Sequence, residues 1–438
     1  MRPVRRGTRA EALGEYLRGA LWALPAAAAA LALVAGSLLS RVRIPPDSVL
    51  RPLAFAGTAD DARQALIAIA STVVTVIALV LGLTIVTLQL ASTQFSPRLL
   101  RNFLRDRPNQ VVLATFIATF AYSAAGLYTV RATGTADFPR LAVTGAIALL
   151  FLSLGMLVFF VHHIVHSIKI DTIMNSVAAA AARTVRAYTA KGPGTDRTGP
   201  APPPEAVVLT APRSGYVQTV HPEVLLRAAA AQDAVVALVA RVGDHVVAGP
   251  EPLALAWSRG GGPPRDVPAL ARALHHTVQI GPERTLRQDT MFGIRQLVDI
   301  ALRALSPAVN DPYTGVQTLD RLSVVVGMLA GRPLGDDVRA DRDGVVRVAV
   351  AGPAFADHLD LACGQIRRYG AGEPAVCLAL LRLLTTAAAS VTDADRRAAV
   401  DGQVRLVLAD AEARIARPAD RVAVRELGAR LMAPRAAG

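Results

Sequence analysis

The sequence predicts a membrane protein in which four membrane-spanning helices are followed by a cytoplasmic α+β region. Hydrophobic residues make up 52% of the 438 residues, and the mean hydropathy is +0.38, which is high for a purely soluble protein. Long uncharged stretches crowd into the first 170 residues, whereas the later residues mix charged and apolar positions as a globular domain does. Two Gly- and Pro-rich breaks then divide the second half into smaller modules.

Four apolar stretches in the region 19–170 are long enough to cross a membrane, because about 20 residues span the roughly 30 Å hydrocarbon core. A basic N-terminal arm, residues 1–18, precedes them. The first stretch is the weakest, since it is Ala-rich and contains Pro25. It is too long for a signal peptide and has no clear cleavage pattern. The four predicted spans cover about 19–40, 65–92, 110–130 and 141–168.

Basic residues beside the short loops predict the orientation of the spans. Cytoplasmic loops are enriched in Lys and Arg, so the N-terminal arm and the segment "PRLLRNFLRDRP" are expected in the cytoplasm, with both termini. The first loop, which this orientation places outside, argues against it, because its four arginines are only partly offset by three aspartates. Leu and Phe alternate with arginine in the segment, which suits a short amphipathic helix at the lipid headgroups; a simple positive-inside loop is the alternative. Its arginines are Arg98, Arg101, Arg105 and Arg107.

The second span carries a polar face. Its small and polar residues recur at offsets of three, four or seven, which places them along one side of a helix. Such a face serves either close packing and hydrogen bonding between membrane helices or the lining of a water-filled path in a ring of subunits. No Asp, Glu, Lys or Arg lies between Gln64 and Pro97, which disfavours ion-coupled transport. The residues expected to line a path are Ser71, Thr75, Gly82, Gln89 and Thr93.

The second half is expected to contain two modules. Residues 171–205 continue as a helix and then a Pro/Gly-rich linker, "KGPGTDRTGPAPPPE". Residues 206–258 alternate short β-branched stretches with turns, which resembles the small barrel-sandwich modules of biotinyl and lipoyl carriers. No lysine follows Lys191, so a prosthetic group cannot be attached there. A second linker, 259–268, leads into a mainly helical domain over 269–438.

The stretch "ALSPAVNDPYTGVQTLDRL" predicts a helix, a tight loop and a second helix. The Ser306-Pro307 pair ends the first helix, Asn310 tolerates unusual backbone angles, and Asp311 is a good N-cap. Local structure therefore explains every polar residue in the loop. The alternative is that Asn310 and Asp311, with Asp289 and Asp299, contact a ligand, a cation or a neighbouring subunit.

The sequence offers little for catalysis, cofactors or nucleic acid. It has no nucleophile elbow, P-loop or zincin pattern, so an enzyme is not expected. Cys363 and Cys377 lack the spacing of a zinc site, and no cofactor is expected. The net charge of +13 is better explained by anionic lipid than by nucleic acid. Three histidines, His162, His163 and His166, end the fourth span; capping explains them most simply, while a metal or pH-sensing role is the alternative.

Three segments together resemble a known family. They are "RQDTMFGIRQLVDIALRALSPAVNDPYTGVQTLDRL", "LGLTIVTLQLASTQFSPRLLRNFLRD" and "HHIVHSI". Their sequences resemble those of the bacterial predicted membrane proteins grouped as domain of unknown function 2254. The resemblance extends from the first span to past Leu322 and implies a multi-span inner-membrane protein with a cytoplasmic C-terminal region. It supplies no activity and no catalytic residue.

Two functions are compatible with these features. The first is an oligomeric pore or channel-like protein, with the second span lining the path, the cytoplasmic region serving assembly or gating, and the bilayer, ions and other copies of the chain as partners. The second is a membrane-anchored sensor or scaffold that binds a ligand or partner through its cytoplasmic domain. Substitution of Gln89 or Gly82 distinguishes them, since only the pore needs those side chains for conduction.

Overall fold

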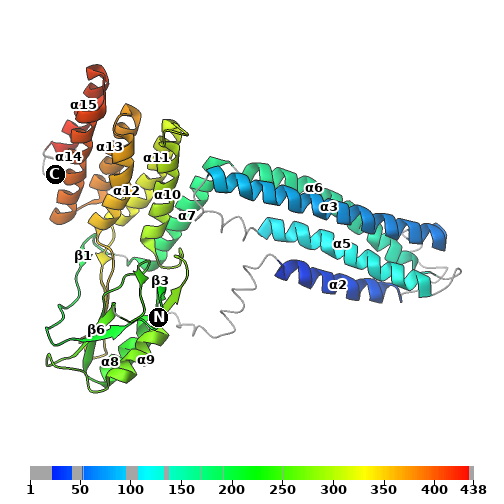
Figure 1. The fold of residues 1–438 in the computed structure, drawn as a ribbon, viewed down its shortest axis with the longest axis horizontal. Helices are drawn as coiled ribbons and strands as arrows, with labels where there is room; N and C mark the ends of the chain where they lie inside the picture. The colour runs from blue at the N-terminus through cyan, green and yellow to red at the C-terminus, as the bar shows by residue number, and fades with distance from the viewer. Residues whose placement is uncertain are drawn as a thin grey trace. The chain divides into compact units, whose positions relative to one another are not determined.

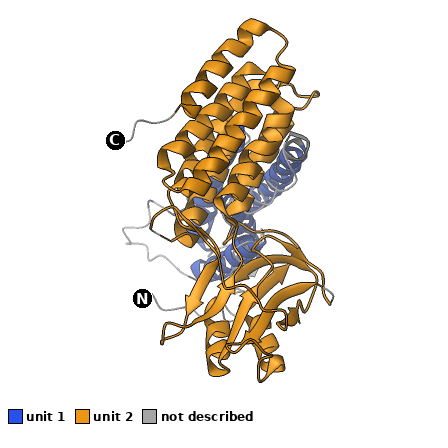
Figure 2. Cartoon of the chain, turned by 90° about the vertical axis from the view of Figure 1, so that its left-hand side faces the viewer, with its two compact units in different colours: residues 1–172 blue, residues 173–438 orange. Residues whose placement is uncertain are grey.

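The computed structural model divides the chain into two compact units, residues 1–172 and residues 173–438 (Figure 2). Figure 1 labels the helices and strands and colours them in chain order. Arg98, Arg101 and Arg105 lie outside the described residues. The structure describes residues 22–41, 52, 54–94, 107–132, 138–167, 169–190, 192–249 and 251–433.

The first unit is helical, and three of its helices are long and apolar enough to cross a membrane: 59–89 within α3, 107–130 within α5 and all of α6. Helix α2 has only 17 residues, about 25 Å, and is a shorter apolar helix. The expected four spans are thus matched by three helices of full length. The helices are α2 (Ala23–Leu39), α3 (Ala59–Gln94), α5 (Arg107–Ala132) and α6 (Arg140–Ser167).

Helix α5 packs against the other three helices of this unit. Small residues allow this close approach: a Cβ added at Gly36 would lie 3.0 Å from the Cβ of Ala125, and one at Gly145 would collide with the Tyr122 hydroxyl. The hydroxyls of Thr119 on α5 and Ser153 on α6 lie 2.8 Å apart and share a buried hydrogen bond. Membrane helices associate through close packing of small residues and occasional hydrogen bonds from hydroxyl groups. The surrounding lipid is as apolar as the side chains, so the hydrophobic effect does not drive this association.

The second unit contains two main sheets and a short parallel pair. The larger sheet has the strand order β2-β6-β4-β10-β9, in which β4 and β10 are parallel and the other pairs are antiparallel. A second antiparallel sheet has the order β5-β3-β7, and β1 pairs with β8. The strands are β1 (Asp196–Arg197), β2 (Val207–Thr210), β3 (Gly215–Val220), β4 (Ala234–Leu238), β5 (His245–Val246), β6 (Pro252–Ser258), β7 (Val278–Gly281), β8 (Leu334–Gly335), β9 (Asp337–Ala340) and β10 (Val346–Val350).

Helices α8 and α9 complete the β part, and a helical bundle forms the rest of the unit (Figure 1). The apolar side chains of α8, α9 and both main sheets share one buried core, which includes Val217, Leu225, Val236, Leu270 and Val348. The helices of this unit are α7 (Ile170–Tyr188), α8 (Pro222–Ala231), α9 (Val267–Thr277), α10 (Thr290–Ala304), α11 (Pro312–Ala330), α12 (Phe355–Gly370), α13 (Pro374–Ser390), α14 (Ala394–Arg414) and α15 (Pro418–Met432).

The β part is not confined to residues 206–258. Strands β7, β9 and β10 come from the region expected to be mainly helical, and β10 lies between β4 and β9. Parallel strands are joined by long crossovers, so local sequence patterns do not reveal their pairing. These sheets do not confirm the expected barrel-sandwich. The expected linker also contributes structure, since Asp196 in β1 pairs in register with Leu334 in β8.

Candidate functional site

The polar face of α3 is exposed to the surroundings of the first unit. Ser71, Thr75 and Gln89 are exposed, and a Cβ added at Gly82 would meet nothing within 4 Å. The opposite side of the helix carries the buried side chains, such as Leu66 at 1% exposure. Among the described residues, therefore, no helix of the same chain covers the polar stripe. Thr93 belongs to α3, but its side chain lies outside the described part.

The depth of each stripe residue follows from the length of α3. Its 36 residues extend about 54 Å, well beyond the roughly 30 Å hydrocarbon core. Measured from Ala65, where the uncharged stretch begins, Thr75 lies about 15 Å along the axis, Gly82 about 25 Å and Gln89 about 36 Å. Thr75 and Gly82 thus fall within the hydrocarbon thickness. Gln89 reaches its far edge, where water can satisfy the amide.

The Thr75 hydroxyl of the stripe has a partner in its own helix. Thr75 Oγ1 donates to the carbonyl oxygen of Ser71 at 3.1 Å, which leaves the hydroxyl oxygen free to accept a hydrogen bond. The spacing of Ser71, Thr75, Ala78 and Gly82 alternates between four and three residues, as in helices that pack along a heptad seam. The stripe consists of small side chains and carries a hydroxyl oxygen that can accept a hydrogen bond from outside the helix. It is therefore suited either to close packing against a second chain or to contact with water.

Of the predicted basic segment, the structure describes Arg107, the exposed first residue of α5. Its position at the start of this helix agrees with a basic loop that ends where the apolar helix begins. Whether the segment is an amphipathic helix stays a prediction, because its other three arginines lie outside the described residues.

Asp289 is the N-cap of α10 and is buried, with 2% of its surface exposed. The Phe292 N–H donates to its Oδ1 at 2.9 Å, and Arg284 Nε donates to its Oδ2 at 2.9 Å. Burial raises the pKa of the Asp289 carboxyl, although Arg284 and the backbone donors oppose that shift. Gly243 has a φ of 99° and packs so closely that a Cβ there would collide with this carboxylate. Asp289 therefore caps α10, pairs with Arg284 and packs closely against the β4–β5 loop.

Asn310 and Asp311 form the predicted loop between α10 and α11. Asn310 has a φ of 49°, and Asp311 accepts hydrogen bonds from Thr314 N at 3.1 Å and Thr314 Oγ1 at 2.6 Å. These bonds lower the pKa of the Asp311 carboxyl. The capped helix-loop-helix geometry expected from the sequence is confirmed residue by residue.

The structure does not bring the four predicted contact residues into one site. Asp289 precedes α10 and Asp311 follows it, so a 15-residue helix of about 22 Å separates them. Asp299 forms an ion pair with Arg295 at 2.8 Å, one helical turn away on α10. The three carboxylates thus have structural partners. A ligand role for these residues and Asn310 stays a prediction.

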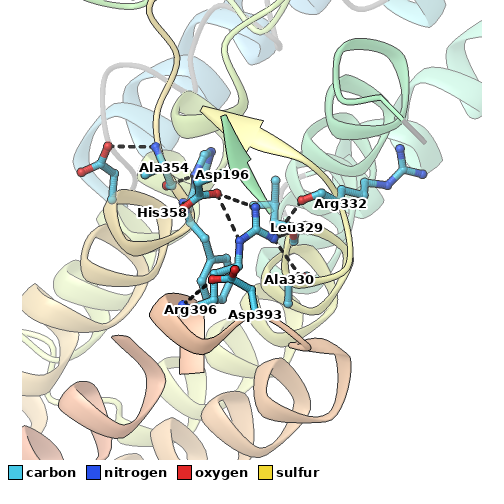
Figure 3. A network of polar contacts seen from close by, with 10 residues as sticks. Asp196, Leu329, Ala330, Arg332, Ala354, His358, Asp393 and Arg396 are labelled. Atoms are coloured by element: carbon cyan, nitrogen blue, oxygen red, sulfur yellow. Dashed lines mark hydrogen bonds and ion pairs between the residues drawn. The ribbon is translucent and has the colours of Figure 1, made fainter. Parts of the chain in front are cut away.

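A polar network around the buried side chain of Arg396, which the sequence did not suggest, joins distant parts of the second unit (Figure 3). Arg396 on α14 has a side chain that is only 1% exposed, and its Nε donates to Asp196 Oδ1 at 3.1 Å. Its Nη1 caps the end of α11 by donating to the carbonyl oxygens of Ala330 at 3.0 Å and Arg332 at 2.8 Å. Asp196 in turn accepts from Phe355 N at the start of α12. One arginine thereby holds three helices and the expected linker together.

His358 forms a second buried connection beside this network (Figure 3). Its Nδ1 lies 2.8 Å from the carbonyl oxygen of Ala354 and its Nε2 lies 2.9 Å from Thr290 Oγ1. A carbonyl oxygen can only accept, so Nδ1 carries the proton and Nε2 accepts from the Thr290 hydroxyl. Burial lowers the pKa of His358 to about 4. The neutral ring therefore links α10 to α12.

Comparison with known sequences gives consistent matches over nearly the whole chain. The family model described as "Predicted membrane protein (DUF2254)" matches residues 18–386. Uncharacterized proteins of Mycobacterium bovis and of two strains of Mycobacterium tuberculosis are each 47% identical to this chain over 430 residues, covering 96% of this chain and 82% of the relative. No solved structure matches the chain significantly.

Proposed function

We propose that this chain, which belongs to the DUF2254 family of predicted membrane proteins, forms an oligomeric pore whose path is lined by α3. The observation that carries the proposal is the uncovered polar stripe of Ser71, Thr75, Gly82 and Gln89. In a ring of copies these stripes would face one another around a central path. The stripe would then be hydrated instead of lying against lipid.

The chemistry of the stripe supports passive conduction of ions. Hydroxyl oxygens and an amide can replace part of an ion's hydration shell, and Gly82 leaves width where a larger side chain would narrow the path. The uncharged stretch of α3 offers no ionisable group near the membrane midplane, where a coupled transporter usually places one. The role needs no catalytic residue and no cofactor.

The proposed topology counts the short helix α2 as a fourth span and places the pore in the bacterial inner membrane, with both termini in the cytoplasm. Helix α6 ends at Ser167 and α7 begins at Ile170, so two residues separate the last candidate span from a core helix of the second unit. The buried residues Met174, Val177 and Val185 anchor α7 within that unit. A shift of α6 would therefore act on the second unit through a short connection, as a cytoplasmic assembly or gating region requires.

Electrical recording from the purified full chain in planar bilayers tests the proposal, with voltage and membrane tension varied. Gly82→Val should lower the unitary conductance because it narrows the path, and Gln89→Leu should change it because it removes a polar group at the pore mouth. Leu81→Val is the matched control, since Leu81 is exposed on α3 outside the stripe.

Discrete currents that change with the two stripe variants, and not with Leu81→Val, support a pore lined by α3. Equal effects of all three variants would contradict that assignment. Silence of folded, inserted protein under every condition would exclude the pore and favour the sensor or scaffold, for which Asp311→Ala is the next variant.

A further inference from the structure

Two histidines lie side by side at the end of α6. His162 and His166 are separated by one helical turn, both are exposed, and their ring centroids are 4.1 Å apart with an angle of 34° between the planes. His166 Nδ1 lies 2.9 Å from the carbonyl oxygen of His162. Because the carbonyl can only accept, Nδ1 carries the proton, and the lone pair of His166 is on Nε2. The His166 ring is thus held in one tautomer, and its Nε2 lone pair is available to coordinate a metal ion.

This arrangement has the features of a metal-binding histidine pair. Histidines that ligate metals usually donate their other ring N–H to a carbonyl or carboxylate, which orients the ring and fixes the tautomer. Two histidines at positions i and i+4 of a helix can coordinate the same ion, as in zincin metalloproteases. Neutral imidazole suits zinc and copper, whereas magnesium and calcium prefer oxygen ligands.

The pair also lies where a hydrated ion can reach it. Measured along the helix from Arg140, His162 lies at about 33 Å and His166 at about 39 Å, beyond the roughly 30 Å hydrocarbon core. Within the described ranges, no group of three or more His, Cys, Asp or Glu side chains could hold a metal ion. An ion bound here would therefore take two imidazole nitrogens from this chain and complete its coordination with water.

We propose that His162 and His166 together bind one divalent transition-metal ion of the zinc and copper class at the water-exposed end of α6. The bound ion would link two side chains of the last turns of α6. Two residues separate the end of α6 from the start of α7. The proposal does not depend on the pore, because it rests on the geometry of this pair alone.

Copper titration of the purified full chain, followed by electron paramagnetic resonance, tests the pair. The spectrum of the wild-type protein should show two coordinating nitrogens for one bound Cu²⁺, and only a large excess of Zn²⁺ should displace that copper, because copper binds such sites more tightly than zinc. His162→Gln and His166→Gln should each leave one nitrogen and weaken copper binding by more than about tenfold, because chelation is lost. Both residues are exposed, so neither variant should disturb folding.

The chain provides two controls. His163 lies between the pair in sequence, but its ring stacks on Phe159 with centroids 5.9 Å apart, so His163→Gln should leave the signal unchanged. Replacing both His275 and His276 by Gln removes other accessible imidazoles and should also leave it unchanged. A two-nitrogen signal that survives either single variant of the pair, or that His163→Gln weakens equally, would overturn the proposal, as would the absence of any two-nitrogen signal in the wild-type protein.

Discussion

The two units differ in how far they rely on polar side chains to join distant segments. In the first unit the helices approach through small residues such as Gly36 and Gly145, and the polar stripe of α3 is exposed. In the second unit, polar groups are buried and connect distant segments, as Arg396 and His358 do. A hydrogen bond between membrane helices adds little stability, because the separated helices also find partners for their polar groups, whereas a satisfied network in a packed globular core fixes one arrangement.

The difference indicates where each unit is vulnerable. A single side chain in the second unit can hold three helices, so its loss should be costly. The first unit distributes its contacts over many small residues and should lose less stability at any one of them.

The largest expected effect is that of Arg396→Ala. It leaves the partly exposed Asp196 carboxylate and the end of α11 without their buried partner, which costs about 3–4 kcal/mol, in the lower part of the range for a broken buried ion pair. Pulse proteolysis of the full chain in urea measures the free energy of unfolding of the second unit. Arg405→Ala is the control, because Arg405 is exposed on the same helix. A loss below about 1 kcal/mol for Arg396→Ala would show that the network is dispensable.

The next effect is a dependence on pH. The pKa of His358 is about 4 in the folded protein against an ordinary value of 6.5, so the unfolded chain binds this proton more tightly. The stabilising contribution of His358 is complete above pH 6.5 and is lost as the pH falls toward 4. The difference between these two pKa values corresponds to about 3 kcal/mol of folding free energy.

Urea unfolding of the second unit at pH 7, 6, 5 and 4 measures this dependence. His358→Gln removes the titrating group, so its stability should fall less steeply over this interval. Parallel curves for the wild-type protein and the variant would contradict a buried neutral histidine.

A smaller effect is expected in the first unit for Gly145→Ala. The new methyl group collides with the Tyr122 hydroxyl, and such overpacking costs about 1–3 kcal/mol. In a Tyr122→Phe background the cost should be smaller, because the colliding oxygen is gone. Hydrogen exchange of α5 and α6 peptides, read as a double-mutant cycle, measures the coupling. Additive effects of the two substitutions would mean that Tyr122 and Gly145 are not in contact.

The smallest effect is that of Asp311→Ala. Loss of an N-cap side chain costs about 1 kcal/mol, and Asp311→Ser should restore most of it. Urea unfolding of the second unit measures both variants. If Asp311→Ala changed no stability, the capping role would be wrong and the ligand hypothesis for Asp311 would gain support.

Local chemistry made some parts of this molecule predictable. The proline, asparagine and aspartate of the α10–α11 loop act within a few residues, so the turn, the cap and the start of α11 follow from the sequence. The long apolar helices follow from composition in the same way, and only the short α2 falls below the length expected of a span. The polar face of α3 is likewise a property of helical spacing.

Contacts between distant segments could not be predicted. Asp196 and Arg396 are 200 residues apart, and each by itself looks like an ordinary surface charge. Strand β10 is a short, largely apolar stretch whose place between β4 and β9 depends on a long crossover. The ring contact of His162 and His166 is partly predictable. Helical spacing places the two residues on one side of α6, whereas the tautomer of His166 follows only from the structure.

The sequence by itself therefore determined the membrane character, the long helices, the capped helix-loop-helix and the position of polar residues along α3, because each depends on neighbours within one or two helical turns. Only the tertiary structure decided which polar residues are buried partners, how the strands are ordered and that the α3 stripe is not covered by another described helix of the chain. Those properties depend on which remote surfaces meet, and the free energy of such contacts is not encoded in any local stretch.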